Sequence, residues 1–482
     1  MEDAYFSTPS VSPVVAKEGH YLHLVDLPSE VLILITEQLD DETLFIATRA
    51  WNGFSRLLNT YNLLHIREMR CFTLKVGFKQ GNLGVGVHVN RRSIHSEFDM
   101  LSEEAFRKLG IRRSVQGLSF EHWLPLCLSE THWMRVKGST YDALEKIGRA
   151  ATVQGPTIHV LYSFMNDVVV KLSEAASDSE ARHSNSRYPF YRPEQKSTLR
   201  HASEKAIESY FQLYHLLVTL ATDRPELAED ANAKIKRFLD GQRDKATCPN
   251  LGHLLVEMLI SNEPDSVELT KAIIKEAVTR NVVWMLDARG KGMADLSYME
   301  PSDSSDYRLA KTYEASKTSY NLLMFANLMR RTVSATDSEA PKTLQERRDE
   351  LFKRHGAPPA GAAAELAAAI RRIQTVNSFP QFLQNMGVSI PAKPEFTRFL
   401  RRTVSESVEK GYSKWALSQE EALAIRLQRE PGVEIAEGVT PRHRALGGVT
   451  FFPQDTVKGG PGGRSGRGGR GGRGGRGGRG GY

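Results

Sequence analysis

Cysteine is scarce in this chain, which has 482 residues and only three cysteines. Cys71, Cys127 and Cys248 are far apart and odd in number, so the sequence excludes the disulfide framework of small secreted domains. This usage favours a reducing compartment, and we expect the protein in the cytoplasm, the nucleus or both. The first residues lack the apolar stretch of a signal peptide. The sequence also contains no run of about 18 apolar residues, so no membrane span is predicted.

Catalytic motifs are missing as well. The sequence contains no P-loop, nucleophile elbow, HExxH or paired CxxC. His122, Cys127 and His132 lie near one another, but their spacing matches no structural zinc pattern and predicts a buried packing segment instead. We therefore predict no catalytic residue, no cofactor and no metal ligand. We also predict that the protein is not an enzyme. A cryptic enzyme in region 139–331 is the alternative, and a deep pocket with converging polar side chains would be its sign.

Positive charge is concentrated at the C-terminal end. Residues 459–482 contain almost only glycine and arginine, and they carry no acidic residue. Subtracting their six arginines from the net charge of +7 leaves +1 for residues 1–458, so nearly all of the excess positive charge lies in this segment. Glycine at this density buries nothing, and the segment is predicted to be disordered. The six arginines are Arg464, Arg467, Arg470, Arg473, Arg476 and Arg479.

This tail resembles the RGG/RG box of RNA-associated proteins. Its guanidinium groups are available for phosphates and for stacking on bases, and they imply non-specific, salt-sensitive RNA binding. The resemblance also implies an arginine methyltransferase as a partner. A flexible, solubilising tail without RNA contact is the alternative.

Near the N-terminus, apolar residues recur at helical spacing on both sides of an acidic turn at residues 40–42. They predict two or three short amphipathic helices, and Pro28 suits a first helical turn. The stretch LPSEVLILITEQLDDETLFIATRAWNGFSRLL resembles an F-box. Leu27 and Pro28 match the opening Leu-Pro of the family, and Phe54 stands near its usual tryptophan. The family's Val-Cys-Arg-x-Trp is replaced by Thr-Arg-Ala-Trp-Asn-Gly-Phe.

The F-box resemblance implies docking on a Skp-type adaptor of a cullin ubiquitin ligase, by burial of leucine and proline anchors in a groove. An ordinary helical hairpin that packs on its own protein is the alternative. The residues that would contact the adaptor are Leu27, Pro28, Val31, Leu32, Ile35 and Leu44.

After the F-box-like stretch, apolar residues first recur at every second position, as in strands, and further along the chain they recur at helical spacing. Alternation over 71–78 and at Val85, Val87 and Val89 predicts a β-hairpin, with a further strand near 94–98. Helical stripes dominate afterwards, including a helix from Pro225 to Gly241. Capping boxes are predicted at Asp265/Glu268 and Ser418/Glu421.

The predicted fold class is therefore mainly α, with an F-box-like helical unit, a small β-hairpin segment, a large irregular α-helical domain and a disordered Gly/Arg-rich tail. The expected boundaries are a disordered lead (1–20), the F-box-like unit (21–62), a small α+β segment (63–138), an α-helical domain (139–331, with an exposed linker at 178–200), a linker (332–360), a C-terminal helical unit (361–430) and a disordered end (431–482).

Together these features indicate an interaction protein. One hypothesis is a substrate receptor that binds a Skp–cullin ligase at one end and RNA through its tail. The other is an RNA-associated scaffold outside any ligase, in which the N-terminal helices are only structural.

Deletion of residues 459–482 is expected to abolish RNA cross-linking of the chain. Six arginine–phosphate contacts also predict a slope of about −4 for the logarithm of RNA affinity against the logarithm of salt concentration. Cross-linking that persists after the deletion would place RNA binding in the folded body.

Overall fold

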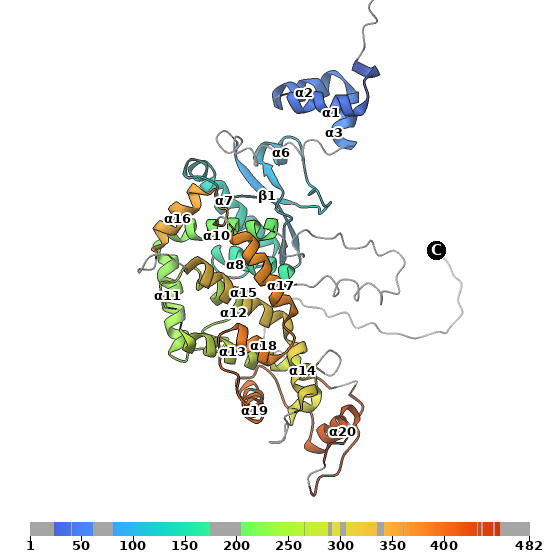
Figure 1. Cartoon of the computed structure of the whole chain (residues 1–482), viewed down its shortest axis with the longest axis vertical. Helices are drawn as coiled ribbons and strands as arrows, with labels where there is room; N and C mark the ends of the chain where they lie inside the picture. Colours follow the sequence, from blue (N-terminus) through green and yellow to red (C-terminus); the bar gives the residue numbers. More distant parts are fainter. Residues whose placement is uncertain are drawn as a thin grey trace, which may run out of the picture.

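The structure is a computed structural model, and it is mainly α-helical with a small antiparallel sheet, which confirms the predicted fold class (Figure 1). The predicted strand at 71–78, the lead 1–20, the linker 178–200 and the arginine tail lie outside the described residues. The structure describes residues 24–39, 41–60, 81–173, 204–264, 266–287, 292–298, 305–334, 342–359, 361–430, 432–434, 437–446 and 449–453.

The N-terminal unit consists of a 3₁₀ turn, η1 (Leu24–Asp26), and helices α1 (Ser29–Gln38), α2 (Asp41–Ala50) and α3 (Asn52–Thr60). Pro28 is the N-cap of α1, and its carbonyl accepts hydrogen bonds from the amides of Val31 and Leu32, both at 3.1 Å. All buried residues of the unit's core come from the unit itself, so it has a small core of its own: Leu32, Leu44, Phe54, Leu57 and Leu58.

The sheet is built around β1 (Leu83–Asn90). β1 contains the predicted alternation at Val85, Val87 and Val89, and the further strand predicted near 94–98 corresponds to β2 (Ser93–His95), which pairs antiparallel with the end of β1. The start of β1 pairs with β3 (Met100–Ser102) and with β4 (His122–Pro125), two strands that the sequence did not predict. A Cβ atom on Gly84 would lie 2.3 Å from the Leu124 carbonyl oxygen, so this glycine permits close strand pairing.

The first core of the body joins this sheet to helices that follow it. Helix α10 (Glu204–Asp223) is apolar around most of its circumference and lies inside the core, with α8 (Ile158–Ser173), α16 (Leu344–Lys353) and α17 (Ala362–Thr375) packed against it. Helix α7 (Glu130–Ala150) also contributes to this core, as do Ala231 and Val256 from two helices of the second core, and α6 (Glu103–Arg107) packs beside β3 and β4.

The second core lies below the first in Figure 1. Helix α15 (Lys317–Ser334) belongs to both cores: Phe325 and Met329 lie in the first, whereas Tyr320 and Met324 lie in the second. The other elements of the second core are α11 (Pro225–Leu239), α12 (Leu251–Glu257), α13 (Val267–Met285), η3 (Ala294–Ser297), α14 (Asp306–Ala315), α18 (Phe379–Asn385), α19 (Lys393–Glu409) and α20 (Gln419–Arg429).

Two segments expected to lie outside the folded body contribute to it. Helix α16, within the predicted linker 332–360, packs against α10 and buries Leu351. The predicted loss of order from residue 431 is wrong for residues 449–453. Phe451 is only 2% exposed, and its carbonyl accepts a hydrogen bond from the Lys414 amide at 3.0 Å. Burial of this aromatic ring outweighs the glycine and proline content around it.

Glu276 of α13 binds residues at the end of α19. Its carboxylate is 2% exposed and accepts hydrogen bonds from Arg280 Nε at 2.7 Å, Lys410 Nζ at 2.9 Å and the Tyr412 hydroxyl at 3.2 Å. The three donors compensate the cost of burying this carboxylate. Loss of its negative charge would leave Arg280 and Lys410 without the anion that they pair with.

Replacement Glu276→Gln is therefore expected to lower the free energy of unfolding by about 3 kcal/mol in urea denaturation. The matched control is Glu314→Gln, because Glu314 pairs with Lys311 at 2.9 Å on the surface. An exposed pair of this kind contributes about 0–1 kcal/mol. Equal effects of the two substitutions would contradict the structural role of Glu276.

His132 joins α7 to the sheet. Its Nε2 accepts a hydrogen bond from the Leu83 amide at 2.8 Å, and the side chain is fully buried. Burial, together with the charge of Arg135, lowers the pKa of His132 from 6.5 to about 4. The unfolded chain therefore binds this proton more readily, so the stability from His132 is complete above pH 6.5 and is lost as the pH falls towards 4.

The free energy of unfolding is expected to fall by about 3 kcal/mol between pH 7 and pH 4 through His132 alone. The variant His132→Gln keeps an acceptor for the Leu83 amide but cannot titrate, so its pH dependence should be shallower by this amount. Urea denaturation of both proteins at several pH values measures the difference. Parallel pH profiles would show that His132 does not titrate as its burial implies.

Candidate functional site

The surface of the N-terminal unit carries several exposed apolar side chains. Along η1 and α1, the exposed fractions are 45% for Leu24, 64% for Val25, 39% for Val31 and 61% for Leu34. Pro28 is exposed between them, at the start of α1. These five residues form what we term the α1 surface. Apolar side chains gathered on so small a unit are typical of a protein-binding surface.

The six residues predicted to contact an adaptor divide into two groups. Leu32 and Leu44 are 6% and 3% exposed and belong to the core of the unit, and the half-buried Leu27 and Ile35 pack against that core. Only Pro28 and Val31 are exposed. Leu24, Val25 and Leu34 could not be recognised from the sequence, because periodicity does not reveal which apolar residues of a short helix remain outside its core.

The segment that departs from the F-box pattern forms a packed corner between α2 and α3. The rings of Trp51 and Phe54 meet edge to face with centroids 5.2 Å apart, and Phe54 is 5% exposed. A Cβ atom on Gly53 would lie 2.2 Å from the Trp51 ring, so any larger residue at this position would force that ring to move. The Trp-Asn-Gly-Phe sequence is thus explained by packing within the unit.

The predicted RNA-binding arginines, Arg464 to Arg479, lie outside the described residues. In the part of the chain that is described, no helix combines the length and apolar character needed to cross a membrane. The same residues contain no group of three or more His, Cys, Asp or Glu side chains arranged to hold a metal ion.

A cysteine–histidine pair is present inside the first core. Cys127 Sγ lies 3.7 Å from His215 Nε2 and 3.2 Å from the Thr219 hydroxyl, and both partners of the pair are fully buried. Burial raises the pKa of the Cys127 thiol far above its ordinary value and lowers the pKa of His215 to about 3. A neutral, inaccessible thiol is a structural residue and not a nucleophile. The two residues are too distant in sequence for spacing to have indicated the pair.

A serine–histidine contact occurs between α8 and α12. Ser163 Oγ lies 3.1 Å from His253 Nε2, and both side chains are half-buried. Burial, with the charge of His159, lowers the pKa of His253 to about 4. The buried carboxylate one turn along α12, Glu257, accepts a hydrogen bond from Lys234 at 2.6 Å instead of orienting the imidazole. The contact therefore lacks the carboxylate that completes a hydrolytic triad.

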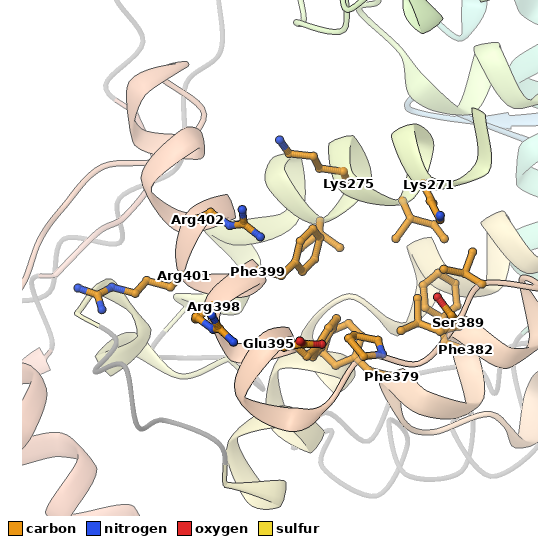
Figure 2. Close-up of a pocket in the computed structure, with 16 residues that line it drawn as sticks. Lys271, Lys275, Phe379, Phe382, Ser389, Glu395, Arg398, Phe399, Arg401 and Arg402 are labelled. Carbon is orange, nitrogen blue, oxygen red and sulfur yellow. The ribbon is translucent and has the colours of Figure 1, made fainter. Parts of the chain in front are cut away.

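A cavity of about 770 Å³ lies elsewhere, between α13, α18 and α19 (Figure 2). Its lining is apolar and cationic, with Ser389 and Glu395 at its edge, and this composition suits binding better than catalysis. No protein-family model matches this chain, and none of the curated proteins is a recognisable relative of it.

Proposed function

We propose that the chain is an F-box-type interaction protein, a receptor that brings a substrate or partner to a Skp–cullin ubiquitin ligase. The observation that carries the proposal is a three-helix unit with its own core that leaves the α1 surface exposed. Pro28 of the F-box-like Leu-Pro pair belongs to this surface, whereas Leu27 packs against the core of the unit. Function then follows from proximity, since the unit holds the ligase while the body holds the target.

The adaptor contact would be the burial of the α1 surface in a groove of the adaptor. Val31 and Leu34 lie one turn apart on α1, and the Pro28 ring begins the same helix. Apolar anchors at such spacing are the usual determinants of helix-in-groove binding. The buried Leu32 and Leu44 would support the surface from inside the unit, so their contribution would be indirect.

The tail adds a second interaction to the proposal. Its six arginines would hold RNA without sequence preference and would be substrates for an arginine methyltransferase. This combination suits a protein of the cytoplasm or nucleus, where both the ligase machinery and RNA occur.

A specific observation favours the alternative, a non-ligase RNA-associated scaffold. Four of the six residues that the F-box resemblance assigns to the adaptor contribute to the unit's own core. Under this alternative the N-terminal helices are structural, and the α1 surface contacts another protein.

The deciding measurement is co-purification of the full-length chain with a Skp-type adaptor. The double replacement Val31→Glu/Leu34→Glu puts two charges on exposed positions, so the fold of the unit should survive. If these residues are interface anchors, adaptor affinity should fall at least about 30-fold. The matched control is Met134→Glu, because Met134 is 72% exposed on α7, outside the unit.

Stoichiometric adaptor binding that survives Met134→Glu and is lost in the double variant would establish the receptor. Absence of adaptor binding by the unaltered chain would eliminate the ligase function and favour the scaffold.

A further inference from the structure

The cavity between α13, α18 and α19 is a groove with an apolar floor. Ile274 and Val278 of α13 form one side of the floor, and Phe379, Phe382 and Phe396 form the other. All five side chains are buried, and Phe399 lies half-buried at the opening. The volume of about 770 Å³ is large enough for several apolar side chains of a bound segment.

The rim of this groove is strongly basic. Lys271 and Lys275 lie on α13, and Arg398, Arg401 and Arg402 lie on α19. In Figure 2, Arg398 and Arg402 flank Phe399, whereas the Arg401 guanidinium extends away from the groove. The lining contains one acidic residue, Glu395.

Most of the rim charge is not neutralised by the protein. Lys275 pairs with Glu406 at 2.8 Å. Considering only residues with a described position, Lys271, Arg398 and Arg402 form no ion pair. Cations that face a hollow without counter-charges produce a positive potential there, and such a potential attracts an anionic ligand.

The two walls of the groove are held at a fixed separation. Outside the lining, Glu276 of α13 binds Lys410 and Tyr412 just after α19, and Lys275 pairs with Glu406 of α19. A preformed groove binds without the cost of ordering its own walls.

We propose that this groove binds an acidic segment of a partner protein that inserts apolar side chains between α13 and α19. The apolar floor receives the inserted side chains, and the carboxylates of the segment pair with Lys271, Arg398 and Arg402. Charge complementarity selects the occupant. The same positive charge disfavours the arginine-rich tail of this chain as an occupant.

RNA fits the groove less well than an acidic peptide does. Single-stranded RNA needs exposed aromatic faces on which bases stack. Phe379, Phe382 and Phe396 are 2%, 0% and 7% exposed, and Phe379 and Phe396 pack on each other with centroids 4.6 Å apart. Their faces are already used within the core, so side-chain insertion above them suits the groove better than stacking.

The interpretation of the groove as the docking site of a ligase substrate rests on the function proposed above. Peptide binding itself does not involve the adaptor, so the groove can be tested without it. Failure of the peptide measurement would leave the adaptor interface intact, and failure of adaptor binding would leave the groove intact.

The test uses the full-length chain and two fluorescein-labelled peptides of 12 residues, measured by fluorescence anisotropy. The first peptide is rich in Glu and carries Leu and Phe at helical spacing, and the second has the same charge with Ser in place of Leu and Phe. The groove should bind the first peptide at least tenfold more tightly. The tail, which recognises charge alone, would bind both equally.

Three variants locate the binding. The double variant Arg398→Glu/Arg402→Glu reverses the charge at two positions of the rim, and Ser389→Trp fills the opening without changing the charge. Each of these two variants should lower the affinity for the first peptide at least tenfold. The control Arg372→Glu makes one such charge reversal at an exposed position of α17, outside the groove, and should have less than a twofold effect. Urea unfolding midpoints show that each variant is folded.

The proposal is overturned if the unaltered chain binds both peptides equally or does not bind the first. It is also overturned if folded rim and Ser389→Trp variants bind as the unaltered chain does. Displacement of the first peptide from the groove by polyuridylate RNA, but not by the second peptide, would assign the site to RNA instead.

Discussion

Helix α15 is buried on two opposite faces, and the two hydrophobic cores of the body meet on it. Phe325 packs with Tyr210 of α10 at 4.9 Å between ring centroids, and on the other face Tyr320 lies 4.8 Å from Phe382 of α18. Phe382 also forms part of the groove floor. The position of the groove therefore depends on the same helix that supports the sheet-containing core, and changes to α15 should affect both.

Features set by local chemistry were predicted well from the sequence. The Ser418/Glu421 capping box is present, and α11 begins at Pro225 and is followed by Gly241, whose φ is 99°. These signals depend on a few neighbouring residues, because caps and turns satisfy backbone groups locally. The other predicted box is not formed: Ser266 is the N-cap of α13 and accepts from the Leu269 amide, and leucine at that position has no side-chain acceptor to complete a box. A serine hydroxyl one residue along offers an equivalent acceptor.

Features set by distant contacts were not predictable. Strand β4 is too short to show alternation, and Gly84 lets its backbone approach β1 closely, whereas Gly86 leaves room for the Phe120 ring beside the strand. The division of the F-box-like residues into buried Leu32 and exposed Val31 follows from how three short helices close on one another. Likewise, the basic groove unites α13 with α19, and no periodicity connects two helices so far apart in the chain.

The three cores differ in how much of the chain each one needs. The core of the N-terminal unit uses residues from Leu32 to Leu58, whereas the first core of the body extends from Leu83 to Ile370 and the second ends at Phe451. During synthesis, the N-terminal unit can therefore fold while most of the chain is still unmade. The first core of the body cannot close before Ile370 has been made, and the second cannot close before Phe451 has been made, so their apolar helices stay exposed on the nascent chain until then.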